Sequence, residues 1–431
     1  MVIRRADGNS NKAGSYDTGQ KRSRWMYILA AEIILLLIIR YLAFIRSTQK
    51  EPRPDPASEV VIRQLIAAPI NKDPNELTNE DFSRIKVLTL QDKTLSDIKL
   101  LEKCTSLYYL NMSNISYPKS AIPKWKTLLG KSGIIDLKER FVIDLRPLEK
   151  LTNLEYIDLF GIPGIRAPIK SIKPLAHLTD LKRLRLVGTE VSDLKPVGNL
   201  KNLQELRIVN NRISNIEPLK ALTNLQKLML SEANVSDLEP LRTMTNLQTL
   251  EIINIQASDL EPLSGLTNLQ ELNLYGNNIS DIEPLADLTN LHNLTLYGTN
   301  VPDLTPIRSL SNLQHLSLVR IQVPDLELIK GLTSLRSLIL NFIEVHDLEA
   351  IRGLVNLTNL NIGSTNVSDL EPIRGLKNLQ SIFIDHTSVS DLEPIKNLKN
   401  LQRLYLRGCP NITDQEIQDF QKALPELKIY R

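Results

Sequence analysis

The side chains that most often carry chemistry are few and scattered in this chain. It has five histidines and two cysteines among 431 residues, namely His177, His292, His315, His346, His386, Cys104 and Cys409. No two histidines have metal-ligand spacing, and the sequence has no close cysteine pair, glycine-rich phosphate loop or nucleophile elbow. We therefore assign no catalytic, cofactor-binding or metal-binding residues. We predict that the protein is not an enzyme and takes neither a cofactor nor a small-molecule substrate.

Aspartates form a regular set of titratable groups. They recur at multiples of 22 residues, each after a serine, at Asp193, Asp237, Asp259, Asp281, Asp369 and Asp391. An aspartate at the start of a helical turn accepts hydrogen bonds from backbone amides. We interpret these residues as caps of short turns, with a structural role.

A leucine repeat of the same period defines the elements that must position these side chains. Leucines stand 22 residues apart at Leu181, Leu203, Leu225, Leu247, Leu269, Leu291, Leu313, Leu335, Leu357, Leu379 and Leu401. A strict repeat of this length means that each unit is one supersecondary element, stable only when it stacks on its neighbours. Such a stack offers a long curved surface and no enclosed pocket, which favours partner recognition over catalysis.

Each unit has the pattern of a strand followed by a turn. The unit from Leu269 reads LQELNLYGNNISDIEPLADLTN. Its L-x-x-L-x-L start alternates apolar and variable residues, as a strand with one buried face does. Asn277 and Asn278 then turn the chain, and Pro284 stands early in a brief 3₁₀ turn.

Counting outward at this spacing predicts about fifteen units from Ile85 to the C-terminus. One of them begins at Ser132, with Ile135 and Leu137 in register. Two units are longer, with extra residues within 117–131 and within 160–172. Insertions in such stacks fall in loops on one face, so a functional loop and a tolerated surface loop are both open.

This pattern resembles the leucine-rich repeat family. The S-D-[LI]-E-P-[LI] segment and the L-T-N-L junction are most similar to the bacterial internalins and to the phosphatase-1-binding leucine-rich regulatory subunit. The resemblance covers roughly Glu59 to Arg431. It implies an α/β solenoid, a right-handed superhelix with a parallel concave β-sheet, short 3₁₀ elements on the convex side and helical caps at both ends.

The ninth position of the unit departs from the family pattern. An asparagine there hydrogen-bonds successive turns in this family, but only Asn211 and Asn277 stand at it here. Elsewhere this position holds threonine, at Thr189, Thr299, Thr365 and Thr387, or an apolar residue such as Ile255, Ile321 and Ile343. Threonine can replace part of the hydrogen bonding and isoleucine none. We expect looser or more strongly twisted turns there, without loss of the fold.

Both ends of the array have cap signals. Ser58 and Thr78 are predicted helix starts, and Thr413-x-x-Glu416 is a capping box ahead of a helix that Pro425 stops. The predicted boundaries are 58–84 for the helical N-cap, 85–412 for the leucine-rich repeats and 413–431 for the C-terminal cap.

Three segments precede the N-cap: a basic tail over 1–24 that we expect to be disordered, an apolar run over 25–45, and a proline-rich linker over 46–57. The apolar run would span about 30 Å as a helix, so we predict one transmembrane helix and a single-pass membrane localisation. No small-x-small site follows it, which favours an uncleaved anchor over a signal peptide. The Lys/Arg balance favours, by a narrow margin, an extracytoplasmic solenoid. Glu32 inside the run is either tolerated near the interface or contacts a neighbouring helix.

Charge argues against nucleic acid as a partner. Residues 1–53 hold ten Lys/Arg and four Asp/Glu, a net +6, so the rest carries −3 of the total +3. A near-neutral array with interspersed signs is not typical of a phosphate-backbone binder. The cysteines lie about fourteen units apart, too far for a disulfide at roughly 4.8 Å per strand, and we interpret both as buried structural residues.

The concave face is the predicted binding surface. The third, fifth and seventh positions of each unit should face it, because they alternate with the buried leucines. The predicted protein-binding residues are Tyr275, Tyr297, Glu271, Asn273, Asn293 and His315 in the middle, and Phe383, Tyr405, Arg403 and Arg407 near the C-terminal end. Tyr275 and Tyr297 should lie on adjacent strands as an amphipathic pair typical of interfaces. A basic set, Arg183, Arg185 and Arg207, lies near the start. The alternative is that all of these are ordinary solvated strand residues.

These observations predict a membrane-anchored leucine-rich repeat protein at the cell envelope that recognises an unknown protein partner through its concave surface. The alternative is a cytoplasmic-facing scaffold or phosphatase-regulatory subunit, which the family resemblance permits and an exported topology excludes. An enzyme that uses the solenoid as a specificity platform would need a catalytic module, for which the sequence gives no sign.

Overall fold

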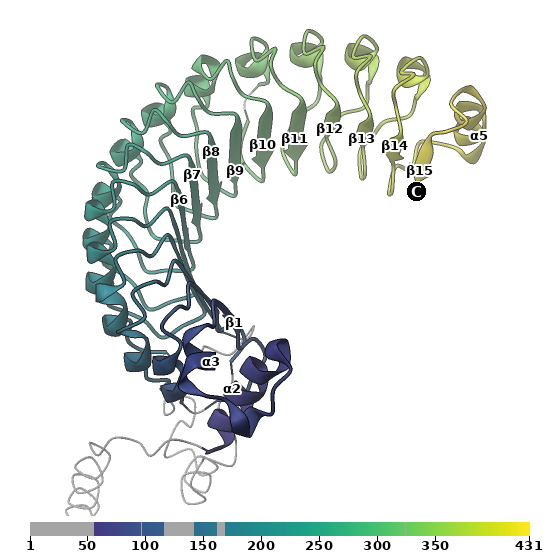
Figure 1. Cartoon of the computed structure of the whole chain (residues 1–431). Coiled ribbons are helices and arrows are strands. Elements are labelled where there is room, and N and C mark those ends of the chain that lie inside the picture. Colours follow the sequence, from purple (N-terminus) through teal and green to yellow (C-terminus); the bar gives the residue numbers. More distant parts are fainter. Residues whose placement is uncertain (1–55, 96, 116–141, 162–168, 324) are drawn as a thin grey trace, which may run out of the picture. The chain divides into compact units, whose positions relative to one another are not determined.

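The computed structural model describes residues 56–95, 97–115, 142–161, 169–323 and 325–431, all within one compact unit, Asp55–Arg431. In this unit the chain coils into short repeats that lie side by side in sequence order (Figure 1). Each repeat places one strand in a common sheet, and 3₁₀ turns follow on the opposite side. The predicted solenoid with a parallel sheet is confirmed.

In the described residues the sheet has fifteen strands in chain order, all pairs being parallel. They are β1 (Val87–Thr89), β2 (Tyr109–Asn111), β3 (Tyr156–Phe160), β4 (Arg183–Val187), β5 (Glu205–Val209), β6 (Lys227–Ser231), β7 (Thr249–Ile253), β8 (Glu271–Tyr275), β9 (Asn293–Tyr297), β10 (His315–Val319), β11 (Ser337–Asn341), β12 (Asn359–Asn361), β13 (Ser381–Phe383), β14 (Arg403–Tyr405) and β15 (Lys428–Tyr430). Figure 1 shows them along the inner side of the curved stack, with the coiled turns on its outer side.

The register places equivalent positions of successive repeats beside one another. Leu272 of β8 pairs with Leu294 of β9, and Leu294 pairs with Leu316 of β10. These leucines form a continuous row inside the stack, and none of the leucines that define the 22-residue period is more than 4 % exposed. Burying one such side chain stabilises the fold by about 1.5–3 kcal/mol, so the row supplies much of the stability.

The outer side is built from 3₁₀ turns. They are η3 (Lys99–Lys103), η6 (Arg146–Leu148), η7 (Lys173–His177), η8 (Lys195–Asn199), η9 (Glu217–Ala221), η10 (Glu239–Leu241), η11 (Glu261–Leu263), η12 (Glu283–Leu285), η13 (Thr305–Ser309), η14 (Glu327–Ile329), η15 (Glu349–Ile351), η16 (Glu371–Ile373) and η17 (Glu393–Ile395). Asp281 accepts a hydrogen bond of 2.8 Å from the backbone N–H of Glu283, the first residue of its turn. The other five recurring aspartates accept the equivalent bond. Their predicted capping role is confirmed.

An asparagine ladder joins the outer edges of the repeats. At the L-x-N-L junction each asparagine donates its side-chain amide to a backbone carbonyl of the preceding repeat; Asn268 Nδ2 lies 2.8 Å from the Thr245 oxygen. The other rungs start at Asn153, Asn202, Asn224, Asn246, Asn290, Asn312, Asn356, Asn378 and Asn400. Asp180 and Ser334 replace the asparagine at two junctions. We did not predict this ladder, although the junction motif contains it.

The ninth position forms a second, inner set of hydrogen bonds. Asn211 donates to the backbone oxygens of Leu186 (2.7 Å) and Val209 (3.0 Å) and accepts from the backbone N–H of Thr189 (3.1 Å). Cys409 occupies the same position in a later repeat, and its Sγ lies 3.0 Å from the Ile384 oxygen. Both cysteines are buried and free, as predicted. The expected looser turns at the isoleucine positions stay a prediction.

One predicted repeat does not join the sheet. Strand β2 pairs directly with β3, with Leu110 beside Ile157. A strand from the predicted unit at Ser132 therefore has no place between them, and that prediction was wrong. Residues 116–141 lie outside the described residues, but η6 follows them, so the extra residues fall between the strand and the outer turn of a single long repeat. The other predicted insertion, within 160–172, lies largely outside the described residues too.

Helices flank the array at both ends. The N-terminal cap contains α2 (Pro56–Ala67), η1 (Ala68–Ile70), η2 (Pro74–Glu76) and α3 (Asn79–Ser83). Helix α2 already includes Pro56 and Ala57, which we had assigned to the linker, and Ser58 is buried within it. Thr78 and Thr413 each form a capping box, with Asp81 and Glu416 respectively, and the second opens α5 (Asp414–Ala423).

Asp81 should make the stability of the N-terminal cap depend on pH. Hydrogen bonds from the Lys72 ammonium and from Thr78 lower the pKa of Asp81 from 3.8 to about 2. A carboxyl whose pKa is lowered in the folded state contributes stability above its unfolded pKa, and loses it as the pH falls through the folded value. We expect amide hydrogen exchange in α3, measured relative to the intrinsic rate at each pH, to accelerate as the pH falls from about 4 to about 2. In an Asp81→Asn variant this acceleration should disappear; the same pH profile in the variant would contradict the assignment.

The predicted membrane-spanning part of the fold class is corrected. The longest helix in the described part of the chain is α2, with 12 residues, which spans about 18 Å against the roughly 30 Å of a hydrocarbon core. No helix among the described residues is long and apolar enough to cross a membrane. The prediction of a transmembrane helix, and of the single-pass membrane localisation that depended on it, is therefore withdrawn. Residues 1–24, 25–45 and 46–55 themselves lie outside the described residues.

Candidate functional site: the concave face of the sheet

The inner face of the sheet presents the side chains that alternate with the buried leucines. In β8 the residues Glu271, Asn273 and Tyr275 are half-buried, whereas Leu272 and Leu274 are buried. The same alternation holds in β9, so Asn293 and Tyr297 face the concave side as predicted. In β10, His315 is exposed, but Val319 is only 9 % exposed.

Tyr275 and Tyr297 lie next to each other in the middle of this face. Their ring centroids are 5.7 Å apart with the planes tilted by 31°. Beside them, Asn293 donates a hydrogen bond of 3.2 Å to Glu271, which fixes both side chains across the β8–β9 boundary. The predicted central set is thus brought together on three adjacent strands, β8, β9 and β10, with Glu271 and Asn293 paired to each other.

Two further residues extend this pair, and the sequence pattern had not indicated them. The Arg320 guanidinium lies over the ring of Tyr297, with its central carbon 5.8 Å from the ring centroid, and 5.1 Å from the centroid of Phe342. Both Arg320 and Phe342 stand at the eighth position of their repeats, immediately after β10 and β11. The alternation along a strand assigns only the third, fifth and seventh positions to the concave face, so it did not predict these two residues.

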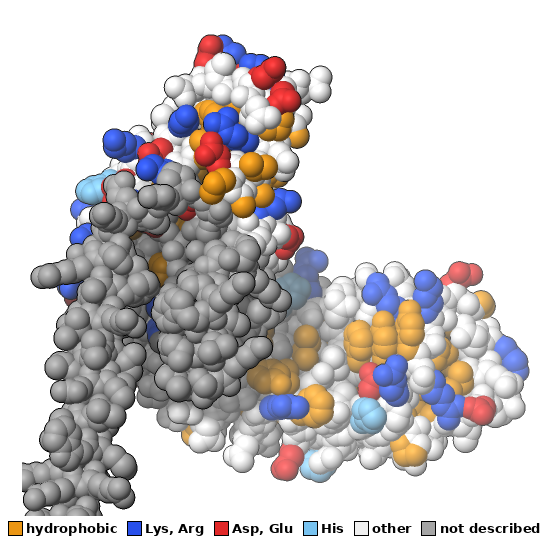
Figure 2. All heavy atoms as spheres, turned by 90° about the horizontal axis from the view of Figure 1, so that it is seen from below, with side chains coloured by type: hydrophobic (Ala, Val, Ile, Leu, Met, Phe, Trp, Pro, Cys, Tyr) orange, Lys and Arg blue, Asp and Glu red, His pale blue; other side chains and the backbone are white. Residues whose placement is uncertain are grey.

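A column of stacked aromatic rings lies at the C-terminal end. Phe383, Tyr405 and Tyr430 come from β13, β14 and β15, and their centroids are 4.2 Å and 4.4 Å apart with nearly parallel planes. Phe383 and Tyr405 were predicted, whereas Tyr430 belongs to the cap strand and was missed. Arg403 and Arg407, also predicted, are exposed near this column. Figure 2 shows hydrophobic side chains gathered among lysines and arginines on the C-terminal part, at the right of the view.

A shallow groove separates the two aromatic sets. It has a volume of about 340 Å³ and is lined by Ser337, Ile339, Asn359, Asn361, Phe383 and Arg403, with adjoining strand residues. A smaller depression of about 120 Å³ lies toward the N-terminal repeats. It is lined by Arg207, Lys227, Met229, Thr249, Glu251 and Glu271, with adjoining strand residues. Both are open depressions that suit side chains of a partner better than an enclosed small molecule.

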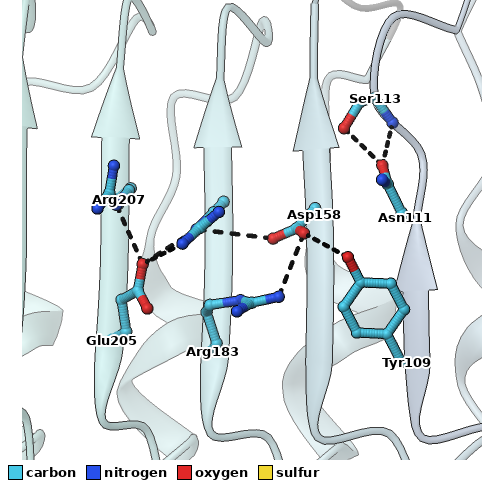
Figure 3. Close-up of polar contacts among 8 residues, drawn as sticks. Tyr109, Asn111, Ser113, Asp158, Arg183, Glu205 and Arg207 are labelled. Atoms are coloured by element: carbon cyan, nitrogen blue, oxygen red, sulfur yellow. Dashed lines mark hydrogen bonds and ion pairs between the residues drawn. The ribbon is translucent and has the colours of Figure 1, made fainter. Parts of the chain in front are cut away.

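The N-terminal part of the concave face carries a network of ion pairs (Figure 3). Asp158 of β3, only 4 % exposed, accepts hydrogen bonds from Tyr109 (3.2 Å) and Arg183 (3.3 Å). Arg185 lies 3.8 Å from the same carboxylate and 2.8 Å from Glu205. The basic set of the sequence prediction is therefore largely neutralised within the sheet, and it offers a partner less free charge than we expected.

The network also shifts the pKa values of its members. Burial, reinforced by the charge of Asp158 and the hydrogen bond to it, raises the pKa of Tyr109. Burial alone would raise the pKa of Glu205, but the hydrogen bonds and charge of Arg185 and the charge of Arg207 hold it below its usual value. Burial likewise raises the pKa of the neighbouring Glu251. Asp158 and Glu205 hold the three arginines in place.

Comparison with known proteins agrees with this architecture. Residues 134–347 match a model described as a leucine-rich repeat region, and residues 377–422 match a model of two leucine-rich repeat copies. A search of the curated proteins found no match. The chain belongs to the leucine-rich repeat proteins.

Solved structures refine this assignment. An internalin of Listeria monocytogenes, InlF, is 28 % identical, with a TM-score of 0.63 over 88 % of this chain and 97 % of that one. The present protein is internalin-like in this sense. A leucine-rich repeat protein of Leptospira interrogans shares the fold at 21 % identity and a TM-score of 0.56, over 82 % of this chain and 97 % of that one.

A plant receptor ectodomain also shares the fold. It is the leucine-rich repeat ectodomain of the Arabidopsis thaliana membrane receptor kinase GASSHO1/SCHENGEN3, 21 % identical with a TM-score of 0.55, over 79 % of this chain and 44 % of that one. Its structure was solved in complex with CASPARIAN STRIP INTEGRITY FACTOR 2. Proteins of this class are typically binding scaffolds without enzymatic activity, and this chain is suited to protein–protein recognition.

Proposed function

We propose that the protein binds a partner protein on the concave face of its sheet, with Tyr275 and Tyr297 as the central contact. The surrounding contacts would come from Glu271, Asn273, Asn293 and His315, and a second contact region from Phe383, Arg403, Tyr405 and Arg407. The single observation that carries the proposal is the pair of adjacent, partly exposed tyrosine rings at the centre of a sheet face that no described residue covers.

The physical chemistry of this pair supports the proposal. Tyrosines supply a large apolar area with little loss of side-chain entropy, and they are enriched among the residues that dominate binding energy. Glu271 and Asn293 already hold each other in place, so less side-chain freedom is lost when a partner docks. The open depressions on either side leave room for partner side chains.

The comparisons support a protein as the occupant, at the level of the fold. The plant ectodomain, on the same type of scaffold, was solved in complex with CASPARIAN STRIP INTEGRITY FACTOR 2. The internalin InlF gives the nearer likeness in sequence among the structures named above. Membrane anchoring and a location at the cell envelope form no part of this proposal.

Site-specific crosslinking tests the proposal in the organism that produces the protein. A photoreactive amino acid at Thr295, two residues before Tyr297 on β9, should crosslink to a defined partner, which mass spectrometry then identifies. The same amino acid at Arg352, on the exposed outer side, should not crosslink to it. A partner captured equally well from both positions would contradict binding through the concave face.

Removing both tyrosine rings should weaken binding of that partner strongly. For a Tyr275→Ala/Tyr297→Ala variant we expect the Kd to rise by about thirtyfold or more, because two central aromatic contacts are truncated. Calorimetry with the purified partner gives the Kd. An Arg352→Ala/Arg374→Ala variant, altered only in exposed outer ion pairs, is the matched control and should bind normally. Unchanged affinity in the tyrosine variant would reject the proposal.

A further inference from the structure

The eighth position of each repeat imposes a left-handed backbone conformation. Its φ angle is positive in every described repeat from Leu181 onward, because the chain leaves the strand there in a tight turn. Glycine occupies it at Gly188, Gly276, Gly298 and Gly408, and asparagine at Asn210 and Asn254. These are the residue types that adopt this conformation at least cost.

Five repeats depart from this preference, at Glu232, Arg320, Phe342, Ser364 and His386, and among these Arg320 and Phe342 have the two largest side chains and lie on adjacent repeats. Their φ angles are 52° and 55°, a region where a bulky side chain is strained. Burial does not offset the strain, because Phe342 is 54 % exposed and Arg320 is exposed as well. The fold would be served better by glycine at both positions. Strained residues that stabilise nothing locally are found mainly at functional sites.

The two residues also complete a continuous surface. The surface is formed by one residue from each of four successive repeats: Tyr275, Tyr297, Arg320 and Phe342. The ring centroids of the two tyrosines are 5.7 Å apart, and the central guanidinium carbon of Arg320 lies 5.8 Å from the Tyr297 centroid and 5.1 Å from the Phe342 centroid. We call these four residues the aromatic–arginine ridge. Arg320 forms no ion pair with any carboxylate of the described residues. The stacked rings hold its planar guanidinium in place and leave its N–H groups free at the edge.

We propose that the aromatic–arginine ridge recognises a segment of the partner protein in which an acidic side chain stands beside an apolar or aromatic one. The carboxylate would pair with the edge of the Arg320 guanidinium, which binds carboxylates in a planar, two-pronged geometry. The apolar side chain would pack on the exposed Phe342 ring. This inference rests on the proposed function, because it names the chemistry of the partner at the same face.

The strain provides a test that separates binding from folding. Arg320→Gly and Phe342→Gly relieve the left-handed strain, so the melting temperature of each variant should equal or exceed that of the wild type. A residue retained for stability would give the opposite result. Loss of binding without loss of stability is therefore the expected signature.

The probe is a random twelve-residue peptide library displayed on phage and selected on the full chain. We expect the selected peptides to share an Asp or Glu within two residues of a Leu, Phe or Trp. The Kd of a synthetic selected peptide should rise at least about tenfold for the Arg320→Gly/Phe342→Gly variant. In single variants, Arg320→Gly should abolish the preference for the acidic residue and Phe342→Gly the preference for the apolar one.

Glu232→Gly is the matched control. Glu232 occupies the same eighth position with a φ of 50° and is exposed, but it lies two repeats away from Tyr275. The control should gain stability in the same way and bind the peptide normally. Selection of peptides without the acidic–apolar pair, or equal peptide binding by the double glycine variant, would overturn the inference. If the tyrosine variant loses the crosslinked partner while the double glycine variant keeps it, the inference fails and the proposed function stands; if neither variant loses it, both fail.

Discussion

Asn211→Ala is expected to lower the free energy of unfolding by roughly 2–4 kcal/mol, a large effect for one polar side chain. Asn211 is 4 % exposed and bridges two successive repeats: its amide donates to Leu186 and Val209, and its carbonyl accepts from Thr189. Alanine would leave the Thr189 N–H without its partner and remove one hydrogen bond from each carbonyl, although the Val209 oxygen still accepts from the Gly188 N–H. The cost of an unpaired buried group exceeds the net value of the hydrogen bond itself.

The measurement is chemical denaturation followed by circular dichroism, with hydrogen exchange to locate the change. The Thr189 amide should exchange faster in the variant, whereas amides several repeats away should change little, because stability in a stack of repeats is carried by neighbours. Thr299→Val is the matched control. Thr299 occupies the same ninth position, but its buried hydroxyl has no hydrogen-bond partner among the described residues, so valine should be neutral or stabilising. Equal destabilisation of the two variants would show that packing, not hydrogen bonding, governs this position.

The regular part of the fold was predictable because one physical requirement repeats. Each strand must bury the same two leucine rows, so a period of 22 residues fixes strand positions and their register together. The caps were predictable for a similar reason, since the capping boxes at Thr78 and Thr413 are local in sequence. The predicted unit at Ser132 failed because spacing alone does not show whether a segment joins the sheet; β2 and β3 pair across it.

The site was predictable only where it follows the strand alternation. Tyr275 and Tyr297 were found because every second strand residue faces the concave side. Arg320 and Phe342 were missed because they stand in a turn, where the pattern gives no face to a side chain. The contact between Tyr109 and Asp158 was missed for another reason. Tyr109 and Asp158 are 49 residues apart across the long repeat, so their contact depends on a strand pairing that the 22-residue count had assigned differently.

The Asp158 carboxylate should be the most sensitive single charge on the concave face. Asp158→Ala is expected to reduce the free energy of unfolding by roughly 2–3 kcal/mol. Asp158 is nearly fully buried, whereas Arg183 and Arg185 retain side-chain exposures of 22 % and 25 %, so water can partly solvate them once the carboxylate is gone. This partial exposure places the expected cost below that of breaking a fully buried ion pair.

A double-mutant cycle separates this interaction from simple truncation. Arg183→Ala leaves the buried carboxylate short of one partner, and Asp158→Ala leaves the arginine short of its own, so the double variant should be less destabilised than the sum of the two single variants. Glu349→Ala, which breaks an outer ion pair with both side chains more than half exposed, is the comparison and should change the unfolding midpoint little. Additive effects of the two single variants would mean that the carboxylate and the arginine do not stabilise each other.

Because Arg185 and Glu205 continue the same network, the Asp158 variant should also loosen Arg185 and free it to bind anions. Its melting temperature should therefore rise with added sulfate more than that of the wild type, and an equal rise in both proteins would refute this coupling.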